Sequence, residues 1–270
     1  MKATLITGAS SGIGEEFARR LAAEGHNLVL VARSEDKLAA LCDELMLEHK
    51  ITAHYVAIDL NDYQADLRLY KETVNHNFEI NWLINNAGFG SMGYFGDLDL
   101  KRELEMIHLN VNVLVSLTHR YLNLMVEDGE GTIINVSSSA SFQPLPFMAT
   151  YAATKAFVTS FTQAIAEEYK PQGLRVLNLC PGATDTGFFD AAGMDEPVMI
   201  KGVQTPDEVV DAALKALEKG KSSVISGWLN YLVASAASVS PDSMVTASVA
   251  KVLRPKVENG PGNETGEEEE

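Results

Sequence analysis

The chain has 270 residues, of which 46% are hydrophobic and 21% charged, which is typical of a globular protein and suits one large α/β domain. Its formal net charge of −16 argues against nucleic acid as a partner, because phosphate backbones are bound by basic surfaces. Two cysteines, Cys42 and Cys180, cannot form a disulfide framework, and six scattered histidines lack metal-ligand spacing, so no metal is expected. The residues after Met1 lack the long apolar region of a signal peptide, and we expect a cytoplasmic protein.

Strand-like and helix-like segments alternate along the chain. Short, mostly apolar runs predict buried strands at Ala3–Thr7, Asn27–Ala32, Thr52–Ile58, Trp82–Asn85, Thr132–Ser137, Arg175–Leu179 and Ser223–Ile225. Helix-like stretches lie at residues 12–24, 34–49, 62–76, 100–126, 151–170 and 206–219. This alternation predicts an α/β fold with a single Rossmann-like, doubly wound parallel sheet of about seven strands, flanked by helices. We expect one domain over residues 1–255.

A glycine-rich turn, Thr7-Gly-Ala-Ser-Ser-Gly-Ile-Gly14, follows the first predicted strand and opens the first predicted helix. Its glycines are spaced G-x-x-x-G-x-G, unlike the commonest dinucleotide fingerprint, G-x-G-x-x-G. Glycines permit a tight turn and let backbone N–H groups approach a pyrophosphate at the helix N-terminus. A purely structural turn is the alternative. The position between strand and helix favours a cofactor phosphate site formed by Gly8, Ser10, Ser11, Gly12, Ile13 and Gly14.

The end of the second predicted strand bears on the choice between NAD and NADP. Enzymes selective for NAD usually carry an acidic residue there to hold the ribose 2′-hydroxyl, whereas here Ala32 is followed by Arg33. A guanidinium suits a 2′-phosphate, so the sequence indicates NADP(H). The alternative is a solvated Arg33 with Glu35 or Asp36 on the ribose. Asp59, after the third strand, is expected either to accept a hydrogen bond from the adenine amino group or to cap a helix.

Tyr151 and Lys155 are four residues apart in a predicted helix, so their side chains share one face. A free phenol has a pKa of roughly 10 and is a poor acid or base near neutrality. An ammonium held beside it favours the phenolate and lowers that pKa. The pair therefore predicts a proton-transferring tyrosine, although an exposed helical pair without a function would show the same spacing.

Together with Asn85-Asn-Ala-Gly88, these motifs occur in an order that resembles the classical short-chain dehydrogenases/reductases over roughly residues 3–226. The resemblance implies that Asn86, Ala87 and Gly88 lie beside the cofactor. It also implies that Pro181, Gly182, Thr184 and Thr186 belong to the loop that contacts the nicotinamide. The family's catalytic residues match Ser138, Tyr151, Lys155 and Asn110, with Asn112 a close neighbour of the last.

The substrate side is expected to be apolar. The segment Phe142–Phe147 precedes the catalytic helix, and Phe188-Phe189 follows the nicotinamide loop; neither contains Arg or Lys. Both segments are expected to line a pocket for a small apolar carbonyl or alcohol, although these Phe residues would also suit a core. A substrate loop that would suit a mobile lid is expected over about residues 186–203.

The carboxyl-terminal region is expected to contain one apolar helix and a tail. Residues Trp228–Val239 are too few for the roughly 20 needed to span a bilayer, so a core, lid or oligomer-contact helix is predicted. Residues 256–270 are rich in Gly, Asn and Glu and predict a disordered acidic tail.

These observations predict an NADP-dependent oxidoreductase that transfers hydride between the nicotinamide and an apolar carbonyl or secondary alcohol. One alternative is a non-catalytic NADP-binding sensor on the same fold, since fold does not determine function. A membrane-associated lipid or steroid enzyme anchored by Trp228–Val239 is another. We also predict a homodimer or homotetramer that pairs through Val113, Leu117, Phe157 and Phe161.

Overall fold

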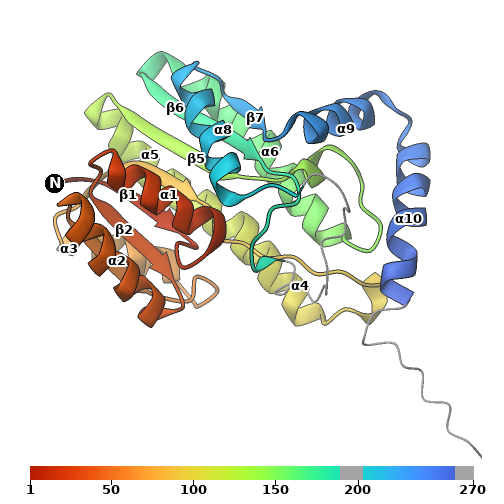
Figure 1. The fold of residues 1–270 in the computed structure, drawn as a ribbon, viewed down its shortest axis with the longest axis horizontal. Helices are drawn as coiled ribbons and strands as arrows, with labels where there is room; N and C mark the ends of the chain where they lie inside the picture. Colours follow the sequence, from red (N-terminus) through yellow and green to blue (C-terminus); the bar gives the residue numbers. More distant parts are fainter. Residues whose placement is uncertain (189–202, 259–270) are drawn as a thin grey trace, which may run out of the picture.

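A seven-stranded parallel sheet forms the centre of the molecule in a computed structural model that describes residues 1–188 and 203–258 (Figure 1). The strands lie in the order β3-β2-β1-β4-β5-β6-β7. Ile6 of β1 pairs with Leu30 of β2 on one side and Ile84 of β4 on the other, so the chain reverses its direction of winding at β1. The doubly wound fold is therefore confirmed. The strands are β1 (Lys2–Thr7), β2 (Leu28–Ala32), β3 (Ala53–Ala57), β4 (Glu79–Asn85), β5 (Gly131–Val136), β6 (Leu174–Cys180) and β7 (Ser223–Ile225).

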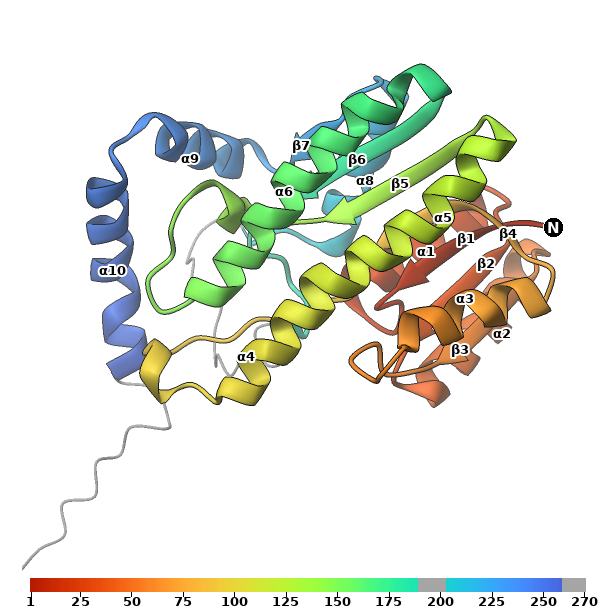
Figure 2. The same ribbon diagram turned by 180° about the vertical axis from the view of Figure 1, so that it is seen from behind.

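Helices cover both faces of the sheet (Figures 1 and 2). One face carries α1 (Gly12–Ala23), α2 (Glu35–His49) and α8 (Pro206–Glu218), whose apolar residues share a core with the strands. The other face carries α3 (Ala65–Asn75), α5 (Leu114–Asp128) and α6 (Ala149–Tyr169), which enclose a second core. Strands buried on both faces explain why their sequences are nearly continuous apolar runs.

The single helix predicted over residues 100–126 is interrupted. It consists of α4 (Leu100–Ile107), a π-helical turn at His108–Val113, and α5. Such π-helical turns within α-helices frequently occur at functional sites. The predicted catalytic residue Asn110 lies in the π-helical turn.

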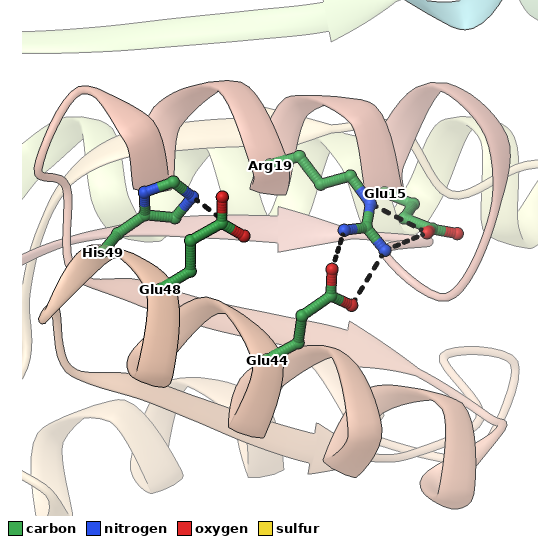
Figure 3. Close-up of polar contacts among 5 residues, drawn as sticks. All are labelled: Glu15, Arg19, Glu44, Glu48 and His49. Atoms are coloured by element: carbon green, nitrogen blue, oxygen red, sulfur yellow. Dashed lines mark hydrogen bonds and ion pairs between the residues drawn. The ribbon is translucent and has the colours of Figure 1, made fainter.

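An ion-pair group joins α1 to α2, the two helices that flank the β1–β2 unit. The Arg19 guanidinium lies 2.8 Å from Glu15 on its own helix and 2.6 Å from Glu44 on α2 (Figure 3). Both carboxylates raise the pKa of Arg19, which therefore keeps its charge. All three side chains are partly exposed, so the pairs orient α2 more than they stabilise the fold.

Two helices extend beyond the carboxyl ends of the strands: α9 (Trp228–Val239) and α10 (Asp242–Glu258) (Figures 1 and 2). The helix predicted for Trp228–Val239 is confirmed. The predicted start of the tail at residue 256 is wrong, because α10 continues to Glu258; the rest of that prediction lies outside the described residues. Among the described helices, none has the length and apolar character needed to cross a bilayer.

Two of the four residues predicted to pair subunits are part of the chain's own core. Val113 is 5% exposed and Leu117 is fully buried under the sheet, so neither is available to a partner. Phe157 is 43% exposed on α6 and stacks on Phe161 with ring centroids 5.8 Å apart. The prediction for Val113 and Leu117 was wrong because an apolar helix face can be covered either by the chain's own core or by a partner subunit. The sequence pattern is the same in both cases.

Candidate functional site

The carboxyl ends of the strands border a cavity of about 1080 Å³. Its walls come from the β1–α1 turn, the residues that follow β2 to β6, and helices α9 and α10. In open parallel sheets, ligands bind where the winding direction reverses, here beside β1. The volume matches the upper range of ligand pockets, with room for a dinucleotide and a substrate.

The β1–α1 turn has the geometry of a phosphate cradle. Gly8 and Gly12 have φ angles of 68° and 58°, a region that residues with a Cβ rarely adopt. A Cβ at Gly14 would overlap the Gly8 carbonyl oxygen. The turn therefore requires glycine, and the N-terminus of α1 faces the cavity with Ser11 at its N-cap position.

The loop after β4 is bonded directly to this turn. The Asn86 amide donates hydrogen bonds to the carbonyl oxygens of Thr7 at 2.9 Å and Gly8 at 3.2 Å. The Thr7 hydroxyl accepts hydrogen bonds from the backbone N–H groups of Asn86 and Ala87, both at 3.0 Å. Asn86 thus holds the two cofactor-facing segments together, and Ala87 and Gly88 line the cavity.

Arg33 and Asp59 line the cavity near the carboxyl ends of β2 and β3. The Arg33 guanidinium is 78% exposed and lies 3.9 Å from the Asp59 carboxylate. Asp59 also accepts a hydrogen bond from the Asn61 backbone, so it shapes the turn after β3 as well as lining the cavity. Glu35, one of the alternative ribose ligands, instead accepts a hydrogen bond from Tyr55 at 3.4 Å.

Tyr151, Lys155 and Ser138 converge on the central wall of the cavity. Tyr151 and Lys155 lie one turn apart on α6 and are 8% and 6% exposed. The Lys155 ammonium donates a hydrogen bond to the Val136 carbonyl at the end of β5, at 2.9 Å, and lies 5.8 Å from the Tyr151 ring centroid. Ser138 follows β5 and is the N-cap of a short 3-10 turn.

Burial dominates the titration of this pair. It raises the pKa of Tyr151 to about 12, an effect that hydrogen bonding with Ser138 partly offsets. It lowers the pKa of Lys155 to about 8. The sequence interpretation, in which the ammonium lowers the phenol pKa, therefore does not describe this state, because desolvation is the largest cause and raises that pKa.

Asn110 lies in the π-helical turn behind this wall and is 1% exposed. Its amide donates to the Phe89 carbonyl at 3.0 Å and to the Thr154 hydroxyl at 3.1 Å, and its carbonyl accepts from the Phe89 N–H. Asn112 is exposed. Any side chain at Gly88 would press against Asn110, so the glycine permits this close approach.

The loop after β6 forms another wall of the cavity. Pro181, Gly182, Thr184 and Thr186 all line the cavity. Sequence reasoning missed Asn230 of α9, whose amide would overlap a Cβ at Gly182. That amide donates to Gln204 at 3.2 Å and to the Ser226 carbonyl at 2.9 Å, so it fixes α9 against the loop. Gly227, directly before the helix, is the N-cap residue of α9 with a φ of 80°. This glycine was the sequence signal that a helix begins at this point.

The substrate half of the cavity is mainly apolar. Leu145 and Met148 line it, whereas Phe147 packs edge-on against Tyr94 with centroids 5.1 Å apart, so the prediction for the Phe142–Phe147 segment is right only in part. Phe188 lies 5.3 Å from the Tyr151 ring; Phe189 and most of the predicted loop, about 186–203, lie outside the described residues. Helix α10, absent from the sequence prediction, adds Met244, Val245, Val249, Val252 and Leu253.

Comparison with known proteins identifies the family. The sequence model of the short chain dehydrogenase family matches residues 2–197. The chain is 32% identical over 235 residues to a very-long-chain 3-oxoacyl-CoA reductase from Macaca fascicularis, covering 85% of this chain and 72% of that protein. It is also 32% identical over 229 residues to a 7beta-hydroxysteroid dehydrogenase from Mediterraneibacter gnavus, covering 84% and 86%.

A solved structure of a short-chain dehydrogenase from Sphingobium yanoikuyae in complex with NADPH is 36% identical. The two structures superimpose with a TM-score of 0.78 over 83% of this chain and 87% of that one. The chain therefore belongs to the short-chain dehydrogenase family and is an oxidoreductase with a Rossmann-like fold.

The buried ammonium of Lys155 predicts a pH-dependent stability without added nucleotide. The folded protein releases this proton near pH 8 and the unfolded chain near 10.5, so between these values the unfolded state binds more protons and stability rises with pH. The difference in the free energy of unfolding between the wild type and Lys155→Met should therefore increase by about 3 kcal/mol, in favour of the wild type, from pH 8 to pH 10.5. Urea unfolding at pH 7–10.5 measures it, with exposed Lys221→Met as the control; a flat difference would contradict the buried-charge interpretation.

Proposed function

We propose that the chain is an NADP(H)-dependent dehydrogenase/reductase that interconverts a bulky apolar ketone or aldehyde and the corresponding alcohol. The observation that carries the proposal is the convergence of Tyr151, Lys155 and Ser138 on one wall of a cavity whose other end is a phosphate cradle. A proton donor and a dinucleotide-sized cleft in one cavity are the parts that carbonyl reduction needs.

The residues present fit the cofactor. The glycine turn of residues 8–14 would hold the pyrophosphate, Asp59 the adenine, and Lys155 the ribose hydroxyls beside the nicotinamide. The loop after β6 would contact the nicotinamide ring through Pro181 and Gly182. When bound, NADP(H) supplies or accepts the hydride.

The chain's own residues handle the proton. In the reductive direction, Tyr151 donates its phenolic proton to the oxygen that develops negative charge, and its raised pKa keeps that proton in place until then. Ser138 donates a hydrogen bond to the same oxygen. Asn110, which is held by its hydrogen bond to the Phe89 carbonyl, would position a water that connects Lys155 to solvent, so that a proton can return to Tyr151.

The shape of the substrate half favours a large apolar molecule. Leu145, Met148 and the α10 residues form an apolar wall, and Arg102 and Glu105 of α4 add charge at its border. One relative, 36% identical over 186 residues, is named for sulfoacetaldehyde, which is small and charged, whereas two others are named for a very-long-chain 3-oxoacyl-CoA and for a 7beta-hydroxysteroid, which are both bulky. We infer a substrate of comparable size with few polar anchors.

The catalytic proposal predicts the effect of removing the phenol. Tyr151→Phe should lower kcat by about 10²–10⁴-fold and leave NADPH binding unchanged, because only the proton donor is lost. NADPH oxidation at 340 nm with bulky ketones, including a steroid ketone and a long-chain 3-oxoacyl thioester, measures turnover. Tight NADPH binding without turnover on any ketone would instead favour the non-catalytic sensor.

The preference for NADP(H) rests on Arg33, whose exposed guanidinium borders the cavity. Arg33→Ala should weaken NADPH binding by about 10–100-fold, the loss of one charge-assisted hydrogen bond, and leave NADH binding nearly unchanged. Titration of each nucleotide by calorimetry measures both affinities. Lys37→Ala removes the same charge from an exposed position on α2 and is the control. Equal losses for NADPH and NADH would contradict a 2′-phosphate contact.

We also propose a homodimer or homotetramer that pairs through α6, where Phe157 and Phe161 stack at the surface. Phe157→Asp should then reduce the molecular mass in solution by half or more, because a buried unpaired charge is costly at an apolar contact. Size-exclusion chromatography with light scattering measures the mass. Leu47→Asp, at a 74% exposed position on α2, should leave it unchanged. A wild-type monomer would contradict the proposal.

The proposed location is the cytoplasm. The two cysteines are buried and free, as expected in a reducing compartment. Against an anchor, α9 has 12 residues, although Trp228 is 76% exposed and Tyr231 58%. Other residues of the same helix, Asn230, Val233 and Ala234, line the cavity, which favours a role for α9 beside the substrate.

A further inference from the structure

We propose that His54, Glu72 and His76 form a binding site for a divalent transition metal of the zinc type, separate from the catalytic cavity. Each side chain offers one ligand atom, and these three atoms all lie within 4.8 Å of one another. None of the three residues lines the catalytic cavity as described. The site would join helix α3 to β3, which is the edge strand of the sheet.

The fold brings these residues together from distant positions. In β3, His54 and Val56 alternate with Tyr55, and Val56 packs into the core on the α3 side of the sheet. Glu72 and His76 are four residues apart at the end of α3, so they share one helix face, as the i, i+4 ligands of known metal sites do. His76 is the C-cap residue of α3 and presents its ring beside the N-terminal half of β3.

The distances leave a metal-sized position between the three side chains. The Glu72 carboxylate oxygen Oε1 lies 3.0 Å from Nε2 of His76 and 4.0 Å from Nε2 of His54. Ligand atoms of a tetrahedral zinc ion, each about 2.0–2.1 Å from the metal, are roughly 3.3 Å apart. The observed pairs bracket that value, so modest side-chain rotations would complete the coordination.

A second observation points to a missing ligand. Nε2 of His54 is buried and has no hydrogen-bond partner within residues 1–188 and 203–258, although it lies 4.0 Å from the Glu72 carboxylate. Buried polar atoms without a partner are rare, and a metal ion would satisfy this one. The two imidazole rings face each other with centroids 4.3 Å apart and planes tilted by 36°.

The donor set selects the class of metal. Two imidazole nitrogens and one carboxylate oxygen suit Zn²⁺ or Co²⁺, whereas Mg²⁺ and Ca²⁺ require oxygen ligands. Three protein ligands leave the fourth position to water. His76 is 46% and Glu72 41% exposed, which gives the ion an entry path. Spacing along the sequence did not reveal the group, because 22 positions separate its two histidines.

Metal binding to the full chain tests the proposal. Tag-free protein, stripped with EDTA and freed of the chelator, is titrated with ZnCl₂ by calorimetry, and with CoCl₂ while visible absorbance is followed. We expect one ion per chain and a rise in Tm of about 5 °C when free Zn²⁺ exceeds Kd a hundredfold. MgCl₂ at the same concentration should give no rise.

Three variants and one control make the test specific. His54→Ala and His76→Ala should each weaken Zn²⁺ binding by about 10–100-fold or more; Glu72→Gln, at a partly exposed position, serves if either fails to fold. His49→Ala is the matched control, since His49 faces only Glu48, at 3.8 Å on α2 (Figure 3), in the described structure. Wild-type protein that binds no Zn²⁺ below millimolar concentrations, or variants that bind as the wild type does, would overturn the proposal.

Discussion

The reversal of winding at β1 is the constraint on which the site depends. Because β2 and β4 pair with opposite sides of β1, the crossover helices leave towards opposite faces and open a crevice at the carboxyl ends of the strands. The glycine turn lies directly above this point and is held there by Asn86. The cofactor-facing residues are thus on rigid elements, and their positions follow from the order of the strands.

Burial of Tyr151 and Lys155 is the second constraint on the site, because it sets the pKa values of both side chains. A phenol with a pKa of about 12 holds its proton, and an ammonium with a pKa of about 8 loses its charge easily. Burial shifts both pKa values towards the neutral form, although Lys155 still keeps its proton at pH 7. The hydrogen bond from Lys155 to the Val136 carbonyl holds the ammonium 5.8 Å from the centroid of the Tyr151 ring. Tyr151 therefore keeps its phenolic proton in the folded protein. In the proposed reaction, that proton is transferred only when a substrate oxygen is bound beside the phenol.

Sequence patterns predicted the sheet well because its strands are apolar on both faces. Every predicted strand is present, although β4 begins at Glu79 instead of Trp82, since Asn81 and Glu79 interrupt the apolar run. The segments expected at the cofactor also line the cavity, because turn glycines and strand ends have fixed places in a parallel sheet. Helix α10 was missed because few of its residues are core-facing: Leu253 is buried only by contacts with the distant cluster around Tyr151.

Two errors and one group that the sequence did not reveal share one physical cause. The pKa of Tyr151, the burial of Val113 and Leu117, and the grouping of His54 with His76 all depend on what surrounds a side chain in space. Local spacing places two side chains on one helix face, but it does not say whether that face meets water, a core or another strand. Charge effects can be anticipated from neighbours in sequence, whereas desolvation requires the whole fold.

Helix α10, near the carboxyl end of the chain, packs beside Tyr151. Leu253 and Val249 pack in the same cluster as Tyr151 and Phe188, so the surface proposed to meet the substrate also helps to bury the phenol. Excluding water strengthens the interaction of Ser138 and Tyr151 with a charged oxygen, because the local dielectric constant falls. A substrate large enough to fill the apolar wall would complete this shield, and a small one would leave it open. In the proposed reaction, the same contacts would therefore favour bulky substrates and also promote proton transfer. The rate would then depend on the size of the substrate, without polar contacts to the part of it that lies far from the carbonyl.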